Sequence, residues 1–431
     1  MLSTIIEELE KISLSGWQCR EVNTQEYQQY WIRDWLESER TVDKKFLEVR
    51  LYKELTSQLQ GEAVFYTTPL EKFQIDEKIA QALQTLQYAP NPPFKLPKPV
   101  NYLNVSTQDE TLASPRERAF EIREKTCATL RLLPTICSSQ EIFIKQHTIT
   151  LINSRGINAS YLKTEYLVDC VLLSGSNREV EVQAILYSSH NKDLEIDKHL
   201  TTYSQYAADA LNASLPATTT ADVVIGDQAL TKLFVPFIVQ SGAEFFYKGI
   251  SRFHPNKSIY PIPTKGDLLT LSTNPTIPFG SETAPFDNEG VALYPLVIIE
   301  DGILKHLWAT KRYADYLKIN PSGEFSNIEV KEGSHSLDEL LVPTSTNPLY
   351  YILEFSYLQP DIVSGDFAAE IRIGYQIDKN NGKRKFIKGG SVTGNIFKMF
   401  SNAIFSKEKL FYRNYLGPKG IKFHNIRVAG D

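Results

Sequence analysis

The chain has 431 residues, of which 42% are hydrophobic and 23% are charged. This composition is typical of soluble globular proteins and excludes disorder as the main state. No apolar run reaches the ~20 residues of a membrane span, the N-terminus shows no secretory signal, and the four cysteines lack a CxxC pair, which favours free thiols in a reducing compartment. We therefore expect a cytoplasmic protein that binds no membrane. At roughly one domain per 150 residues, the length suggests two or three domains.

The first half of the chain is predicted to mix helices with an antiparallel sheet. Ser114 as N-cap, Pro115 as the first helical residue and Glu117 at the third position form a strong helix-start signal. Later runs rich in β-branched residues favour strands with one wet face. The predicted helices cover 76–87, 115–133 and 193–213, the predicted strands cover 141–152 and 179–187, and the proline-rich segment 89–99 is expected to be an extended connector without regular structure.

The second half changes character after a small, polar segment, 216–222, which we predict to be a linker. Short apolar runs separated by Gly and Pro favour a barrel or sandwich, and Asp301-Gly302 between apolar residues indicates a β-hairpin. One apolar helix is predicted over about 228–247. The predicted strands cover 267–271, 294–300, 302–307, 350–357 and 370–378.

The predicted fold class is therefore α+β. An N-terminal α/β domain with a mostly antiparallel sheet spans residues 1–215. A C-terminal antiparallel β-barrel-like domain with one apolar helix spans residues 223–431.

Common catalytic motifs are missing from the sequence. It contains no GxGxxG, GxxxxGK[ST], GxSxG or HExxH, so dinucleotide, P-loop, hydrolase-elbow and helical zinc-protease interpretations have no support. The seven histidines are scattered. Glu195 and His199, four residues apart on a predicted helix, are better explained as a surface pair than as metal ligands.

An ordered series of short segments carries more information. Asp287-Asn288-Glu289-Gly290 is followed by Val363-Ser364-Gly365-Asp366-Phe367, then by Val392-Thr393-Gly394-Asn395 and a terminal Ile426-Arg427-Val428-Ala429-Gly430. Their order and spacing across 222–431 resemble the TldD/PmbA family, long labelled modulator of DNA gyrase. The resemblance implies an N-terminal α/β domain, a C-terminal antiparallel β-barrel-like domain, and assembly as dimers.

The resemblance also implies a division of labour between two types of subunit. In active members, a helix carries HExxxH and a later cysteine completes the metal site of a peptidase that cuts unfolded peptides. The PmbA type, also called TldE, lacks this motif and pairs with the active subunit. Together they mature ribosomally made peptide antibiotics and degrade a labile antitoxin.

This chain resembles the PmbA type. Aligned by the Gly-x-Glu that trails the motif, it has Pro236, Phe237 and Ser241 where the family has His, Glu and His. A proline and a phenyl ring donate no electron pair to zinc, a neutral serine is a poor ligand, and no cysteine follows Cys170.

We therefore expect a PmbA/TldE-like subunit that is inactive alone, with no cofactor in this chain and zinc in a TldD-type partner. That partner is a TldD-type metallopeptidase subunit in a heterodimer or a second copy in a homodimer, and the expected substrate is an extended peptide. The family-motif positions without an assigned role are Ser241, Gly242, Glu244, Asp287, Glu289, Gly290, Gly365, Asp366, Gly394 and Asn395.

Two alternatives stay open. The first is a stand-alone or homodimeric member with an unrecognised site, using Ser241 or the pair of Asp287 and Glu289. The second is a gyrase- or nucleic-acid-associated protein that uses the basic stretch 379–427, which carries twelve Lys or Arg against one acid. Nucleic acid is disfavoured because aromatic residues at such spacing more often fill a barrel core. The aromatic residues concerned are Phe386, Phe397, Phe400, Phe405, Phe411 and Tyr412.

Overall fold

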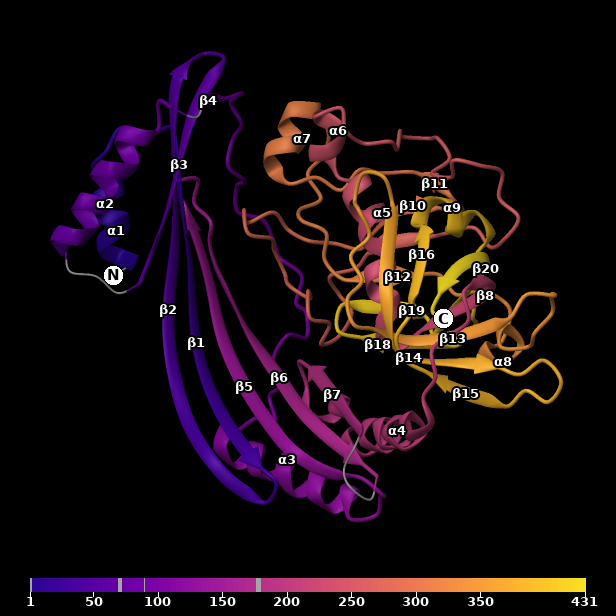
Figure 1. Ribbon diagram of the computed structural model, residues 1–431. Helices are drawn as coiled ribbons and strands as arrows, with labels where there is room; N and C mark the ends of the chain where they lie inside the picture. The colour runs from indigo at the N-terminus through magenta and orange to yellow at the C-terminus, as the bar shows by residue number, and fades with distance from the viewer. Residues whose placement is uncertain (1, 69–71, 89, 176–179) are drawn as a thin grey trace.

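A long, curved sheet dominates the first half of the chain and turns its concave face toward the C-terminal part (Figure 1). The computed structural model describes residues 2–68, 72–88, 90–175 and 180–431. Within these ranges the sheet has the antiparallel order β4-β3-β2-β1-β5-β6-β7. The strands are β1 Gly16–Ile32, β2 Trp35–Thr56, β3 Leu59–Thr67, β4 Pro90–Asn91, β5 Ile136–Asn153, β6 Asn158–Ser174 and β7 Val180–Ser188.

Helices pack on this sheet near its two ends. Near one end, α1 Leu2–Glu10 and α2 Lys72–Thr85 pack on apolar residues of β1 to β3. Near the other, α3 Pro115–Leu130 and α4 Ile196–Asp209 pack on β5 to β7. These results confirm the predicted helices with shifted ends. The Ser114 hydroxyl accepts a hydrogen bond from the Glu117 N–H at 3.3 Å, as the start signal predicts.

The C-terminal part contains a closed barrel. Five strands of the described chain form the ring β13-β8-β20-β16-β14, which closes through a β13–β14 pairing. All neighbouring pairs are antiparallel except β8 with β13. The strands are β8 Thr219–Gly226, β13 Leu349–Phe355, β14 Asp366–Ile377, β16 Ser391–Asn395 and β20 Gly420–Ala429, with β15 Arg384–Ile387 and β17 Ile404–Phe405 attached.

A second sheet flanks the barrel in the order β11-β10-β9-β12-β19-β18. Its strands are β9 Leu271–Thr273, β10 Leu296–Glu300, β11 Ile303–Leu304, β12 Ile328–Val330, β18 Lys409–Tyr412 and β19 Tyr415–Pro418. The predicted hairpin is confirmed, since Glu300 pairs with Ile303 and both Asp301 and Gly302 have positive φ. The short helices nearby are α7 Lys311–Leu317, α8 Leu337–Leu340 and α9 Ile396–Met399.

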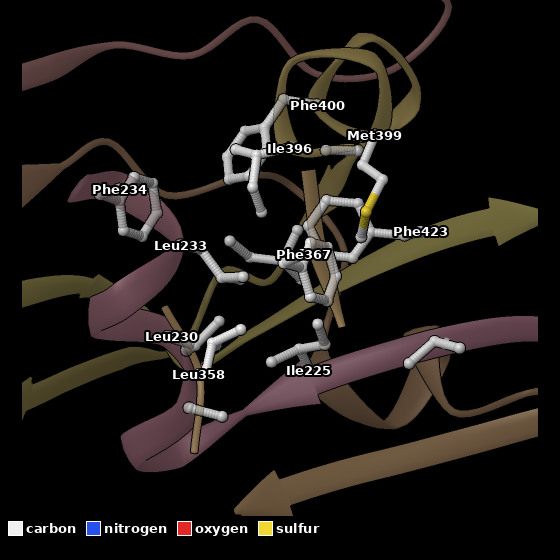
Figure 2. Close-up of a cluster of buried hydrophobic side chains, with 14 of the residues drawn as sticks. Ile225, Leu230, Leu233, Phe234, Leu358, Phe367, Ile396, Met399, Phe400 and Phe423 are labelled. Carbon is white, nitrogen blue, oxygen red and sulfur yellow. The ribbon is translucent and has the colours of Figure 1, made fainter. Parts of the chain in front are cut away.

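The apolar segment predicted as one helix is divided into three. It forms the 3₁₀ helix η3 Asp227–Phe234, then α5 Val235–Gln240, then α6 Ala243–Tyr247. The break falls at Gly242, whose backbone is extended and pairs with Trp308. Figure 2 shows Leu230, Leu233 and Phe234 from this segment beside barrel residues such as Ile225 and Phe367. Within the segment, η3 and α5 therefore pack in the barrel core, whereas α6 packs against α7 through Ala243 and its Tyr247 is exposed.

Four other predictions need correction. Residues 267–270 form no strand, because Asp267 instead binds the backbone of Ala403 and Phe405. The strand predicted at 302–307 is only Ile303–Leu304. Part of the connector is regular, since Pro90–Asn91 pairs with β3. The end of the segment predicted as a linker is the start of β8, at Thr219. Residues 89 and 179, which two predicted segments include, lie outside the described residues. Of the helices in the described ranges, none is long and apolar enough to cross a membrane.

Candidate functional site

Helix α5 occupies the place where the resemblance puts a metal motif, and its side chains belong to the barrel core. Pro236 stands in the first turn, where its missing N–H leaves no broken helical bond. Phe237 is fully buried. Its ring lies 4.8 Å from that of Phe400, 5.4 Å from Phe397 and 6.1 Å from Phe253, measured between centroids. The helix therefore contributes aromatic packing here and no metal-binding atom.

Ser241 caps the C-terminus of α5 and is fully buried. Its N–H donates to the Phe237 carbonyl at 3.0 Å, and its own carbonyl accepts from the Trp308 N–H at 3.3 Å. The Ser241 hydroxyl has no hydrogen-bond partner among the described residues. A serine nucleophile needs an adjacent base, and no histidine occurs between His199 and His254.

The residues present do not fit the zinc that the family implies. In the described ranges, no group of three or more His, Cys, Asp or Glu side chains is placed to hold a metal ion. Glu195 forms an ion pair with Lys198 at 2.5 Å, and its side chain has no bond to His199 among the described contacts. We therefore derive no chemical step through a metal in this chain.

The Gly365 and Asn395 positions meet where β14 begins and β16 ends. Asp366 pairs with Asn395, and Phe367 pairs with Gly394. The Asn395 amide donates to the Ser364 carbonyl at 2.8 Å and to the Asp366 carboxylate at 2.7 Å, while its oxygen caps α9. Gly365 has φ +83°, and a Cβ there would lie 2.5 Å from the Phe397 ring. Glycine is thus required for close packing.

Gln240 connects this group with the end of α5, and the sequence analysis did not identify it. Its amide nitrogen donates to the Ile362 carbonyl at 2.7 Å, and its oxygen accepts from the Arg252 N–H at 2.6 Å. The Arg252 guanidinium lies 4.4 Å from the Phe397 ring centroid. Gln240 could have been identified from the sequence as a polar residue within an apolar helical segment. Such a residue is expected to be buried, as Gln240 is, and a buried amide needs hydrogen-bond partners.

Asp287 organises a buried loop. One carboxylate oxygen accepts the N–H groups of Glu289 at 2.9 Å and Val291 at 2.8 Å, and the other accepts the Glu324 N–H at 3.1 Å. Burial, together with the charges of Glu289 and Glu324, raises the pKa of Asp287 to about 8. The loop's Gly290, at φ +87°, receives a hydrogen bond from the Tyr102 hydroxyl at 3.0 Å. These contacts give Asp287 and Glu289 a structural role.

Helix α7 joins the Asp287 loop to α6 and to the N-terminal sheet. The Lys311 N–H donates to Glu289 at 2.8 Å, and the Tyr313 hydroxyl donates to Glu244 at 3.0 Å. Although burial acts in the opposite direction, hydrogen bonds from Lys248 and Tyr313 lower the pKa of Glu244. Arg312 forms an ion pair with Glu62 of β3 at 2.6 Å. Of the family-motif positions, Glu244 and Glu289 are therefore bonded to α7, and Asp366 is bonded to Asn395.

A cavity of about 1090 Å³ lies between α4 of the N-terminal part and strands β13 and β14 of the barrel. Residues of β7 and β18 also line it, and each of these is an end strand of its sheet. The Arg413 guanidinium bridges them, 5.1 Å from the Tyr187 ring and 5.5 Å from the Tyr412 ring. This cavity could not be predicted from the sequence, because its walls come from segments that are distant in the chain.

The aromatic residues of the basic stretch are mostly inside the protein. Phe386, Phe397, Phe400 and Phe405 are each at most 4% exposed, whereas Phe411 is 40% exposed. A buried ring cannot stack on a nucleic-acid base. The structure thus gives no support to base stacking by these four residues.

Comparisons with known proteins agree with this architecture. Residues 218–430 match the family model described as the PmbA/TldA metallopeptidase C-terminal domain. A metalloprotease PmbA homolog from Buchnera aphidicola (Acyrthosiphon pisum) is 25% identical over 307 residues, covering 69% of this chain and 66% of the relative. An uncharacterised protein from Methanocaldococcus jannaschii is 31% identical over 152 residues, covering 32% of this chain and 35% of that protein. The chain thus spans less than two thirds of the length of these curated relatives.

Solved structures match over nearly the whole chain. TldE from Thermococcus kodakarensis has a TM-score of 0.80 at 17% identity, covering 99% of this chain and 100% of that one. A Thermotoga maritima protein described as a candidate modulator of DNA gyrase has a TM-score of 0.82 at 16% identity, with 99% of both chains covered. At these identities the match concerns the fold. With the family match of its C-terminal half and its curated relatives, the chain belongs to the TldD/PmbA family.

Proposed function

We propose that this chain is the PmbA/TldE-like, non-catalytic subunit of a TldD/TldE-type metallopeptidase complex acting on unfolded peptides. The observation that carries the proposal is helix α5, where Pro236 and Phe237 are buried in the core and Ser241 lacks a base. Hydrolysis by the family route needs a metal-bound water. The residues that the structure describes supply no ligand set for one, so we assign zinc to a TldD-type partner.

The role we assign to this subunit is to shape the substrate cavity and hold an extended peptide. Support comes from β7 and β18, two end strands that line one cavity. An end strand has main-chain N–H and C=O groups without a neighbouring strand, and an extended peptide binds such an edge with little dependence on its sequence. This suits unfolded substrates of varied composition, as in peptide maturation or proteolysis.

We further propose that the complex is cytoplasmic. Support comes from the four cysteines, all of which are free thiols, as in proteins of reducing compartments. The partner is either the TldD-type subunit or a second copy of this chain, and the first is our proposal.

Two measurements test the assignment. Metal analysis of the chain purified alone should find far less than one zinc per chain, and light scattering after mixing with a TldD-type subunit from the same source should find a one-to-one complex. Stoichiometric zinc in the isolated chain would overturn the non-catalytic assignment. Separate elution of the two subunits would overturn the partnership.

A further inference from the structure

The cavity between α4 and the barrel has an aromatic wall. Tyr203 and Tyr206 project from one face of α4, with ring centroids 5.4 Å apart, and Tyr206 lies 6.3 Å from Tyr375 of β14. Gln228 donates a 2.6 Å hydrogen bond to the Tyr203 hydroxyl, and the Tyr375 hydroxyl donates a 2.7 Å bond to Asp209. These bonds fix Tyr203 and Tyr375, which are 7% and 5% exposed, whereas Tyr206 is half-buried and offers more ring surface to the cavity.

Two carboxyl groups line the same cavity without full partners. The Asp227 side chain has no hydrogen bond or ion pair within the described ranges, although the charges of Lys419 and Lys198 partly offset the effect of burial on its pKa. Its backbone has φ +49°, which is costly for a residue other than glycine. Glu354 pairs with Arg372 through one oxygen at 3.5 Å, while its Oε2 has no hydrogen-bond partner among the described residues. After burial, the charge of Glu354 has the largest effect in raising the pKa of Tyr203, and Asp227 adds to it. The charges of both acids therefore act on Tyr203, and all three residues line the same cavity.

The burial of the charged side chains that line the cavity indicates which charge a bound ligand should carry. The cations that also line the cavity are Lys192, Lys198, Arg384, Lys409, Arg413 and Lys419. All except Lys419 are exposed, so water already solvates them, and Lys419 is half-buried. Asp227 and Glu354 are half-buried, and burial raises the pKa of each. An unpaired buried carboxylate is unfavourable, and a cation that pairs with it relieves that cost. Tyrosine rings attract the same type of group through their negative faces.

We propose that this cavity binds the cationic side chain of a polypeptide, a lysine or an arginine, between the rings of Tyr203 and Tyr206 and the carboxyl groups of Asp227 and Glu354. The inference rests on the proposed peptide-holding function and deepens it, because it gives a subunit without a metal site a preference among peptides. Main-chain pairing to β7 or β18 holds any extended peptide, and the pocket selects those with a basic residue at one position.

Fluorescence anisotropy with the full chain alone tests this inference. The probes are three labelled, capped heptapeptides of alanine and serine that differ only at the central residue, which is lysine, norleucine or glutamate. Norleucine keeps the aliphatic stem and removes the charge. We expect the lysine peptide to bind at least about fivefold more tightly than the norleucine peptide, and the glutamate peptide to bind most weakly.

Variants identify the groups responsible. Asp227→Asn tolerates the positive φ, and Glu354→Gln keeps the shape of the side chain, so both should fold with unchanged thermal midpoints or higher ones. Each should bring the ratio of lysine to norleucine affinity close to one. Asp338→Asn, which removes an exposed carboxylate lining the same cavity, is the matched control and should leave the ratio unchanged.

The outcomes separate this inference from the function on which it rests. Equal affinity for the lysine and norleucine peptides would overturn the cation pocket and leave the peptide-holding role intact. Preference for the glutamate peptide would overturn it in favour of the exposed arginines. Failure of all three peptides to bind would overturn both the pocket and the peptide-holding role of the isolated chain.

Discussion

The ring of Phe237 packs against that of Phe400 with their centroids 4.8 Å apart and their planes 63° from parallel. The buried phenyl ring of Phe237 therefore occupies the position where the resemblance puts a catalytic glutamate. Phe253 and Phe397 surround the same ring. The helix that carries chemistry in active family members is, in this chain, part of the barrel core.

Truncation of this ring should therefore cost stability. Phe237→Ala should lower the free energy of unfolding by about 3–5 kcal/mol, because it removes a fully buried aromatic side chain and leaves a cavity. Phe411→Ala is the control, since that ring is 40% exposed, and its effect should stay below about 1 kcal/mol. Urea unfolding followed by tryptophan fluorescence measures both. Equal effects would contradict the core role of α5.

Gly365 should tolerate no side chain. Gly365→Ala combines a positive φ of +83° with a Cβ 2.5 Å from the Phe397 ring. We expect a loss of more than about 2 kcal/mol from strain and displaced packing. Gly382→Ala has a similar φ of +67° with nothing within 4 Å, so it isolates the backbone cost of roughly 1–2 kcal/mol. Similar thermal midpoints for the two variants would show that the packing of Gly365 against Phe397 does not contribute to stability.

The pKa of Asp287 predicts a pH dependence. Because the folded-state pKa, about 8, lies above the unfolded value, the native state holds a proton that the unfolded state releases. The contribution of this group to stability is fully present below the unfolded pKa and is lost as pH rises through the folded pKa. Stability should therefore fall between about pH 4 and pH 8.

Asp287→Asn removes this titration. The amide keeps one acceptor for the Glu289 and Val291 N–H groups but offers a donor to the Glu324 N–H, so at pH 5 the variant should be less stable by about 1–3 kcal/mol. By pH 8.5 the difference in the free energy of unfolding between the unmodified chain and the variant should become smaller or change sign. Chemical unfolding at pH 5, 7 and 8.5 measures it, and a gap that is independent of pH would refute the role given to Asp287.

The Arg312–Glu62 ion pair should stabilise the contact between the two parts of the molecule. Both side chains are at most 17% exposed, and removal of Arg312 leaves Glu62 with only the more distant Arg50, at 3.9 Å. Arg312→Ala should cost about 3 kcal/mol. Lys305→Ala removes the exposed Lys305–Glu300 pair and should change stability by less than about 1 kcal/mol. Comparable losses in the two variants would show that this ion pair is no stronger than a surface pair.

How far the sequence predicts this fold depends on how local the signals are. The start of α3 at Pro115 and the Asp301-Gly302 turn follow from a few neighbouring residues, and both are confirmed. The long strand β1 escaped prediction because polar residues such as Gln18 and Gln29 are buried on it, and β2 escaped because apolar residues such as Trp35 and Phe46 are exposed on it. Both features obscure the alternation of polar and apolar residues. Apolar composition suggested one helix at 228–247, but the Gly242 pairing with Trp308 that breaks it is a tertiary contact.

The candidate site, like the fold, could be predicted from the sequence only where the signals are local. The sequence alone shows that the segment 228–247 contains no histidine, so it could be predicted that this segment lacks the family's metal ligands. The cavity could not, because Tyr203, Asp227 and Glu354 come from three elements that only the fold brings together. The hydrogen bond from Gln240 to Ile362 likewise joins residues 122 positions apart.

The central claim is most directly tested by a cleavage assay on an unfolded peptide. The assay compares this chain alone, a TldD-type subunit from the same source alone, and the two mixed, each with and without a chelator. We predict cleavage by the mixture that is faster than by either subunit alone and that the chelator abolishes. Chelator-sensitive cleavage by this chain alone would contradict the account, because it would require a metal site that helix α5 does not provide.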